Sequence, residues 1–535
     1  MFVKMAELKE DIKFNPYQER VLNNPSTSMI VAHAVGSGKT LTGIAKFEKL
    51  KREGKATKAL VVVPAGLREN FGGEGVKKFT NSKYNIIGNK VEASSGQYKG
   101  IDPDSDYNIM SYEMFRQNPQ KYIKESGADT VIADEMHRLR NEGLSTVESF
   151  QKTRPLYKNF IGLTGSLVNN SVSDVQPLVD IASGNEHKLG PNKKGFEKLF
   201  IKRNEKGPYK KMKESRRPIT GFKFPKQLSA ELNKYIDYAD NADMKDIAKI
   251  PTKVTKVTDV PISEQQLKIY KGILSKNPAV AKLITRKRLE TLKGDEIATA
   301  YNQLIEARKL MNSVGSVMPG MDLTTSAKVT PKAKKILDDL QSHISKTPDG
   351  QAILLTNLIR GGADVLEAGL KERGIPYGEF IGKGNKGITE ETRQKAIKDY
   401  QSGKNKVMVI SGAGAEGISL GDTTWEGLFD PHYNPERMYQ MEARGVRARG
   451  LSKRAPQDRQ VEVNRYKSTV PKFLGIFKKY PYKTPDEVIY EIANNKDAQN
   501  QMLYKLLKDT QKKPKEMKVW KISTKNKYIN KQELF

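Results

Sequence analysis

The sequence predicts an α/β protein with two parallel-sheet lobes in tandem and a mainly helical insertion between them. Short apolar runs alternate with helix-compatible stretches through residues 29–182. A second series follows, with strand-like runs at 351–357 and 405–411, and helical patterns dominate residues 263–310 between the two series. The expected parts are a first lobe at 1–225, a helical insertion and linker at 226–325, a second lobe at 326–505 and a basic tail at 506–535.

Composition narrows the class of protein. The 535 residues include 93 Lys and Arg against 62 Asp and Glu, a formal charge of +31. This excess favours a polyanionic partner, most often nucleic acid, although a lysine-rich solvated surface explains the charge equally well. The absence of cysteine excludes disulfides, zinc fingers and thiol catalysis. No apolar run approaches the roughly 18 residues of a membrane span, and the charged N-terminus does not resemble a signal peptide. We therefore expect an intracellular protein with no membrane partner.

The first chemical motif is MIVAHAVGSGKT at residues 29–40, which predicts a strand, a glycine-rich turn and a helix start. Backbone N–H groups of such a turn surround an anion, and the helix N-terminus adds partial positive charge. Lys39 is placed to reach the β- and γ-phosphates of a nucleotide, and the Thr40 hydroxyl to bind Mg²⁺. His33 stands where the full motif has its first glycine, so a glycine-rich loop without a ligand is the alternative. The residues expected to hold the nucleotide here are Gly36, Ser37, Gly38, Lys39 and Thr40.

Two further features of the first half suit the same chemistry. Gln18 precedes the loop by about 20 positions, and its amide can read an adenine edge, though a surface glutamine on a helix is the alternative. TVIADEMHRLRN at 130–141 places Asp134 and Glu135 at the carboxyl end of a strand, where α/β ligand sites form. Asp134 suits a Mg²⁺ partner and Glu135 suits a residue that activates water. His137 is expected either to relay the nucleotide state or to cap and pack.

Other stretches complete the predicted lobes. Residues 59–63, 107–112 and 161–166 read as buried strands of the first sheet. Residues 185–255 are basic with interleaved aromatics, which suits either a phosphate-backbone contact or a solvated insertion. Residues 505–535 carry ten lysines and little periodicity, as expected for a frayed basic tail.

The second half contains another glycine-rich turn at 411–420, followed by FDPHYNPE and YQMEARGVRAR. On a helix, Gln440, Arg444 and Arg447 fall at i, i+4 and i+7, on one face. Three aligned polar groups suit a γ-phosphate sensor and an arginine finger. An exposed basic helix is the alternative.

These motifs together resemble the two-lobed ATPases of helicase superfamily two, most closely the Swi/Snf-related group with its DEAH-type box. NPYQ is similar to the adenine-reading motif of that family, GSGKT to its first motif, LVVVPAGLRENF to LVVxPxxLxxNW, DEMHRLRN to DEAHRLKN and LTGSLVNN to LTGTPLQN. SGAGAEGISL, FDPHYNPE and QMEARGVR are similar to SxxxGGxGLNL, DxxWNP and QAxGRxxR. Phe71, Leu167 and Ala443 depart from these patterns, and compact, lysine-rich members of the group are familiar from large DNA viruses and phages.

The resemblance implies two RecA-like lobes with ATP and Mg²⁺ in the cleft between them, and movement on nucleic acid, most of all double-stranded DNA. It assigns Lys39, Glu135, Arg444 and Arg447 to catalysis, and Thr40 and Asp134 to the metal. It adds Gly417 and Gln440 to the nucleotide-binding residues Gln18, Gly36, Ser37, Gly38, Lys39 and Thr40. Nucleic-acid contacts are expected near Arg68, Ser111, Thr356 and Ser411. A strand-separating DNA or RNA helicase, and a nucleic-acid-binding scaffold with an inactive ATPase, remain the alternatives.

Overall fold

The computed structural model describes residues 8–9, 12–88, 100–141, 143–244, 250–286, 289–318, 320–382, 387–412, 420–446, 450–473, 477–478 and 482–511. The chain forms two compact units. The first contains Met1–Lys210, Ile219–Ile247 and Gln499–Phe535, and the second contains Lys211–Pro218 and Ala248–Ala498. Arg447 and Gly417, two of the predicted site residues, lie outside the described residues.

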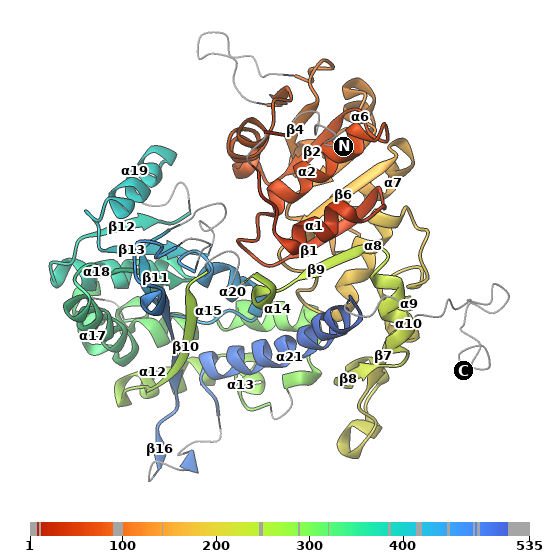
Figure 1. The fold of residues 1–535 in the computed structure, drawn as a ribbon. Helices are drawn as coiled ribbons and strands as arrows, with labels where there is room; N and C mark the ends of the chain where they lie inside the picture. The colour runs from red at the N-terminus through yellow and green to blue at the C-terminus, as the bar shows by residue number, and fades with distance from the viewer. Residues whose placement is uncertain are drawn as a thin grey trace. The chain divides into compact units, whose positions relative to one another are not determined.

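The first unit is built on a seven-stranded sheet in the order β3-β4-β2-β5-β6-β1-β9 (Figure 1). Every neighbouring pair in this sheet is parallel. The carboxyl ends of these strands therefore share one edge, where ligand sites of open α/β sheets form. The strands are β1 (Ser28–His33), β2 (Ala59–Val63), β3 (Tyr84–Ile86), β4 (Tyr107–Ser111), β5 (Thr130–Ala133), β6 (Asn159–Thr164) and β9 (Ile236–Ala239).

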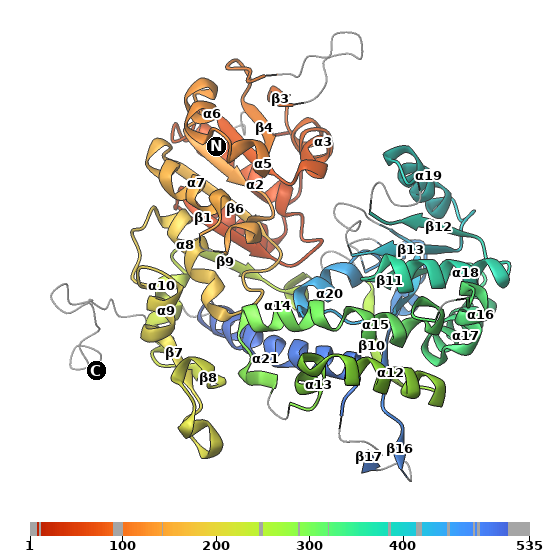
Figure 2. The same cartoon turned by 180° about the vertical axis from the view of Figure 1, so that it is seen from behind.

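Side chains alternate between two cores, one on each face of this sheet. Ile30 and Ala32 of β1 pack with α7 and α8, whereas Met29 and Val31 pack with α2 (Figure 1 and Figure 2). Burial on both faces explains why the strands read as continuous apolar runs. The helices of this unit are α1 (Pro16–Asn23), α2 (Lys39–Arg52), α3 (Arg68–Asn70), α5 (Tyr112–Phe115), α6 (Pro119–Ser126), α7 (Ser145–Thr153), α8 (Val175–Ser183), α9 (Lys193–Phe200), α10 (Pro225–Leu232) and α11 (Asn241–Met244), and an antiparallel pair joins β7 (Ile201–Arg203) to β8 (Ile219–Phe222).

The second unit contains a six-stranded sheet in the order β10-β15-β14-β11-β13-β12, again parallel throughout. Residues of its strands β11, β13 and β14 again divide between two cores, with α17 and α18 on one face and α19 and α20 on the other. The elements of the sheet layer are β10 (Thr252–Pro261), β11 (Gln351–Thr356), β12 (Tyr377–Phe380), β13 (Val407–Ser411), β14 (Thr423–Leu428), β15 (Gln460–Thr469), α16 (Leu323–Val329), α17 (Pro331–Lys346), α18 (Asp364–Glu372), α19 (Glu390–Gln401) and α20 (Pro435–Glu442), and β16 (Lys472–Phe473) pairs with β17 (Phe477–Lys478).

A helical group inserted before β11 has its own apolar core within the second unit. It comprises α12 (Glu264–Lys276), α13 (Pro278–Ile284), α14 (Gly294–Gln303) and α15 (Ile305–Asn312). The last helix, α21 (Pro485–Gln511), contributes Val488, Ile489 and Ile492 to this core. None of the described helices is long and apolar enough to cross a membrane.

The prediction of two parallel-sheet lobes with a helical insertion is confirmed. Two details differ from the expected organisation. β9 falls in the segment assigned to the insertion, yet it pairs with β1 as the edge strand of the first sheet. Residues 506–511, expected in the tail, belong to α21, because Leu503 and Leu507 are buried in the core of the first unit. The expected boundaries otherwise stay predictions.

Candidate active site

The glycine-rich loop connects β1, which ends at His33, to α2, which begins at Lys39. Gly36 and Gly38 have φ of 85° and 76°, a left-handed backbone that glycine adopts without steric cost. The Lys39 ammonium donates to the carbonyl oxygen of Ala34, at 3.2 Å. Thr40 lies in the first turn of α2, partly exposed. The predicted succession of strand, left-handed turn and helix N-terminus is present, an arrangement that binds anions in many proteins, and phosphate binding here stays a prediction.

Helix α1 is fastened to this loop by two side chains. The Tyr17 hydroxyl and the Gln18 amide both donate to the carbonyl oxygen of Ser37, at 3.1 and 3.3 Å. The same amide donates to the Thr42 hydroxyl (3.2 Å), and its oxygen accepts from the backbone N–H of Asn15 (2.9 Å). These hydrogen bonds of the Gln18 amide connect α1 to the loop, and the side chain is only 2% exposed. Recognition of an adenine edge by Gln18 stays a prediction. The sequence motifs do not predict the contact of Tyr17 with the loop. The only indication in the sequence is the position of this tyrosine directly before Gln18.

Asp134 and Glu135 follow β5 directly, at the same edge of the sheet. Burial and the neighbouring Glu135 carboxylate raise the pKa of Asp134 to about 7, although Lys39 acts in the opposite direction. Glu135 has φ 50° and ψ 46°, a left-handed conformation that costs a non-glycine residue roughly 1–2 kcal/mol. Its own N–H donates to the Asp134 carboxylate at 2.9 Å. A strained backbone and a carboxyl group with a perturbed pKa are features of functional sites.

The LTGS motif at the end of β6 lies close to the glycine-rich loop and to the segment that follows β5. The Nδ1 atom of His137 lies 3.1 Å from Oε2 of Glu135 and 3.4 Å from the Thr164 hydroxyl. A Cβ placed on Gly165 would lie 3.6 Å from the ammonium nitrogen of Lys39. The fold therefore brings together, at one edge of the sheet, the motifs that follow β1, β5 and β6.

The candidate metal ligands of these motifs are oxygen atoms. Mg²⁺ prefers hard oxygen ligands and is usually held by one or two protein groups, with water and phosphate completing its shell. The Thr40 hydroxyl and the buried Asp134 carboxylate fit this preference. A carboxyl group with a raised pKa also gains from a nearby cation, which favours its ionised form. Among the described residues, no group of three or more His, Asp or Glu side chains is arranged to hold a metal ion.

In the second unit, the helix expected to carry Gln440 and Arg444 is shorter than predicted. Gln440 lies on α20, but this helix ends at Glu442, so Arg444 stands in the turn beyond it. The turn forms because the N–H of Gly445 donates to the buried Glu426 carboxylate (3.0 Å) and the carbonyl oxygen of Arg444 accepts from the N–H of Leu420 (3.1 Å). The expectation that one helical face carries both Gln440 and Arg444 is therefore wrong.

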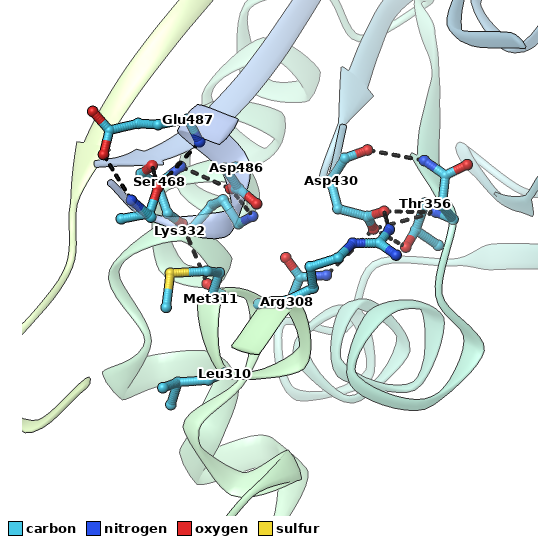
Figure 3. A network of polar contacts seen from close by, with 12 residues as sticks. Arg308, Leu310, Met311, Lys332, Thr356, Asp430, Ser468, Asp486 and Glu487 are labelled. Atoms are coloured by element: carbon cyan, nitrogen blue, oxygen red, sulfur yellow. Dashed lines mark hydrogen bonds and ion pairs between the residues drawn. The ribbon is translucent and has the colours of Figure 1, made fainter. Parts of the chain in front are cut away.

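A buried polar network surrounds Thr356, at the end of β11. Its hydroxyl donates to Asp430, and the backbone N–H of Asn357 donates to the same carboxylate at 3.0 Å. Arg308 of α15 also donates to Asp430, at 3.5 Å (Figure 3). The amide of Asn312, on the same helix, donates to this carboxylate at 3.3 Å. The Thr356 hydroxyl is thus used inside the protein.

The end of the neighbouring strand β13 is buried in the same way. Ser411, its last residue, is 1% exposed and Thr356 is fully buried. The structure leaves both side chains inside the second unit, and contacts of these two positions with nucleic acid stay a prediction.

The two remaining predicted nucleic-acid residues lie in the first unit. Arg68 donates to the carbonyl oxygen of Ile87 (2.7 Å) and to that of Ala65 (3.2 Å), and its side chain is half-buried. Ser111, at the end of β4, caps α5 by accepting from the N–H of Met114 at 3.2 Å. Ser111 ends β4 and Arg68 follows β2, and their contacts with nucleic acid stay predictions.

Comparison with known proteins agrees with these motifs. A family model described as SNF2-related domain matches residues 17–316, and one described as helicase conserved C-terminal domain matches residues 333–449. "Putative ATP-dependent RNA helicase L538" of Acanthamoeba polyphaga mimivirus is 22% identical over 450 residues, 83% of this chain and 86% of that protein. "Uncharacterized ATP-dependent helicase YqhH" of Bacillus subtilis (strain 168) is 22% identical over 438 residues, 79% of this chain and 70% of that protein.

Other similarities are more distant or shorter. "DNA repair and recombination protein RAD54" of Oryza sativa subsp. japonica is 27% identical over 175 residues, which cover 30% of this chain and 18% of that protein. The solved structure "Sulfolobus solfataricus SWI2/SNF2 ATPase core in complex with dsDNA" is 18% identical, with a TM-score of 0.38, over 97% of this chain and 100% of that chain. The SNF2-related model alone matches more than half of the length of this chain. The chain therefore belongs to the SNF2-related family of ATP-dependent helicases and is a nucleic-acid-dependent ATPase.

Proposed function

We propose that this protein is a motor that hydrolyses ATP with Mg²⁺ and moves along double-stranded DNA. The match of the SNF2-related domain to residues 17–316 carries this proposal, because that segment contains the glycine-rich loop and the Asp134–Glu135 pair. Two shorter matches agree with DNA as the track: the Oryza protein named for DNA repair and recombination, and "Protein CHROMATIN REMODELING 25" of Arabidopsis thaliana, 27% identical over 165 residues. The formal charge of +31 also suits a polyanionic track.

The residues of the first unit divide the chemistry among them. Lys39 and the N–H groups of the loop bind the phosphates of ATP, and the α2 N-terminus adds favourable charge. Thr40 and Asp134 hold Mg²⁺, which when bound supplies positive charge against the phosphate oxygens. Glu135 orients the attacking water and accepts its proton, and His137 holds the Glu135 carboxylate in place (3.1 Å).

The second unit contributes the remaining groups. By resemblance we assign Gln440, Arg444 and Arg447 to stabilisation of the charge that develops on the transferred phosphoryl group. Arg68 and Ser111 of the first unit bind the nucleic-acid backbone. The side chains of Thr356 and Ser411, at the ends of β11 and β13, are buried, so contacts of these two positions with nucleic acid stay a prediction.

A strand-separating RNA helicase is the second candidate. It is favoured by the mimivirus relative, which is named an RNA helicase and matches 83% of this chain. The two candidates differ in the nucleic acid that stimulates hydrolysis, because duplex translocases respond to duplex DNA and strand-separating enzymes respond to the strand they bind.

The test is steady-state ATP hydrolysis with no nucleic acid, single-stranded DNA, duplex DNA and RNA, with Glu135→Gln as the inactive control. We expect strong stimulation by duplex DNA that the control lacks. Preferential stimulation by RNA or by single strands would replace this proposal with the helicase. If no nucleic acid stimulates ATP hydrolysis, both the translocase and the helicase are contradicted. The result would favour the nucleic-acid-binding scaffold.

A further inference from the structure

A buried carboxylate on the edge strand β9 contacts both α1 and the start of the glycine-rich loop. Asp237 accepts a forked pair of hydrogen bonds from Arg20, with Nε to Oδ2 and Nη2 to Oδ1 both at 2.7 Å. Its Oδ1 atom also lies 2.7 Å from Nε2 of His33. The Asp237 side chain is 6% exposed and that of His33 is fully buried. No sequence motif marks Asp237, which lies 204 positions after His33.

The charge states of this cluster follow from its contacts. Burial alone would raise the pKa of Asp237, but the hydrogen bonds from His33 and Arg20 hold it below the ordinary value. Burial lowers the pKa of His33, so its imidazole is neutral near pH 7. Since a carboxylate only accepts hydrogen bonds, Nε2 of His33 carries the proton and donates. Asp237 is therefore the shared anion that orients both of its partners.

β9 continues its support into the loop itself. The N–H of Ala34, directly after His33, donates to the carbonyl oxygen of Ala239 at 2.8 Å. The carbonyl oxygen of Ala34 in turn accepts from the Lys39 ammonium at 3.2 Å. The lysine of the phosphate loop is thus two hydrogen bonds away from the strand that carries Asp237.

Arg20 makes the other connection, because it lies on the helix that is fastened to the loop. Its neighbours Tyr17 and Gln18 both donate to the carbonyl oxygen of Ser37. The Tyr17 ring also meets the His33 ring edge to face, with 5.3 Å between centroids. One carboxylate therefore joins the two pieces of chain, α1 and the loop, that form the nucleotide cradle.

We propose that Asp237 is a positioning residue of the ATP site, which holds α1 and the glycine-rich loop in the arrangement that binds nucleotide. The inference rests on the ATP site of the proposed function. Pre-ordered groups lose less conformational entropy when a ligand binds. Without the carboxylate, nucleotide must order α1 and the loop itself, so affinity falls whereas the chemical step, carried by Glu135, does not change.

The experiment uses three test variants: Asp237→Asn, Arg20→Gln and the double variant that combines these two substitutions. Each is compared with a control variant, Asp240→Asn. Asp240 is the matched control, an aspartate three residues later that pairs with Lys508 and contacts neither α1 nor the loop in any hydrogen bond of the described residues. The readouts are KM for ATP and kcat, the Kd of a fluorescent ADP analogue, and the thermal midpoint. We expect both single variants to raise KM and Kd about tenfold, the loss that one charge-assisted hydrogen bond commonly produces, with kcat within about twofold.

The double variant should be no worse than the more severe single variant, since Arg20 and Asp237 act as one unit. A folded Asp237→Asn protein with a lowered thermal midpoint but wild-type KM and Kd would overturn the inference, and so would an equal effect of Asp240→Asn. If Asp237→Asn does not fold, Arg20→Gln answers the same question, because the Arg20 side chain is 42% exposed and its replacement leaves the core intact. Wild-type protein that binds the ADP analogue without stimulated hydrolysis contradicts the proposed motor, and the Kd comparison still decides the role of Asp237.

Discussion

The imidazole of His137 holds the carboxylate of Glu135 from two residues away, with 3.1 Å between Nδ1 and Oε2. This contact fixes a side chain whose own backbone is left-handed at φ 50°. We expect Glu135→Gln to lower kcat by about 10²–10⁴-fold, the usual contribution of a general base, because an amide cannot accept a proton from water. ATP affinity should change little. Glu113→Gln, an exposed carboxylate of the same unit, is the control, and wild-type kcat in Glu135→Gln would contradict the assignment.

His137 itself gives a second prediction. Without the imidazole, Glu135 samples orientations that do not reach the attacking water, so kcat should fall about tenfold while KM for ATP stays constant. Steady-state kinetics of His137→Ala measure both values. A rise in KM at constant kcat would show instead that His137 serves binding.

Lys46 predicts a pH dependence of stability in the first unit. Its ammonium lies on α2, is almost fully buried and donates to the carbonyl oxygen of Asn24, just beyond the end of α1. Burial, aided by the positive charge of Lys49, lowers the pKa of Lys46 from 10.5 to about 8. Between pH 8 and 10.5 the unfolded chain binds more protons at this site than the folded one, so this group makes the folded state more stable as pH rises.

The measurement is the free energy of unfolding of wild type and Lys46→Met at pH 7 and at pH 10. The difference between them should shift by about 2 kcal/mol in favour of wild type at the higher pH. Lys78→Met, which removes an exposed lysine of the same unit that pairs with Glu74, controls for general charge effects. A wild-type advantage that is the same at both pH values would contradict the prediction.

A buried ion pair in the second unit predicts an asymmetric response to substitution. The Lys332 ammonium and the Asp486 carboxylate are 2.6 Å apart, and both side chains are 1% exposed (Figure 3). Lys332→Met leaves a buried carboxylate without its cation, which should destabilise the second unit by about 3–5 kcal/mol. Replacing both partners, in Lys332→Met with Asp486→Asn, should cost less than Lys332→Met alone, because no uncompensated charge remains. Thermal unfolding checks the order, and a double variant that is less stable than the single one would contradict it.

The sequence could predict the features that depend on short spacing. Short apolar runs predict the central strands of both sheets, because these strands are buried on two faces. Lys39 and Thr40 begin α2, and Asp134 and Glu135 directly follow β5, as their motifs indicate. It could not predict features that depend on distant partners. The end of α20 before Arg444 depends on Glu426, and the burial of Thr356 depends on Asp430.

The glycine-rich loop has the same limit. His33 interrupts the familiar motif, and its spacing alone gives no reason for an imidazole at that position. The reason is the carboxylate of Asp237 on an edge strand far along the chain. Motif spacing describes groups that touch the ligand, whereas the groups that hold them come from elsewhere in the fold.

Movement along duplex DNA is tested most directly by triplex displacement, in which a third strand bound to duplex DNA is released only when a motor passes beneath it. We predict ATP-dependent release by the wild-type protein, no release by Glu135→Gln, and no separation of the two duplex strands themselves. A wild-type protein that hydrolyses ATP on duplex DNA but never displaces the third strand, or that separates the duplex, would contradict the proposed double-stranded DNA translocase.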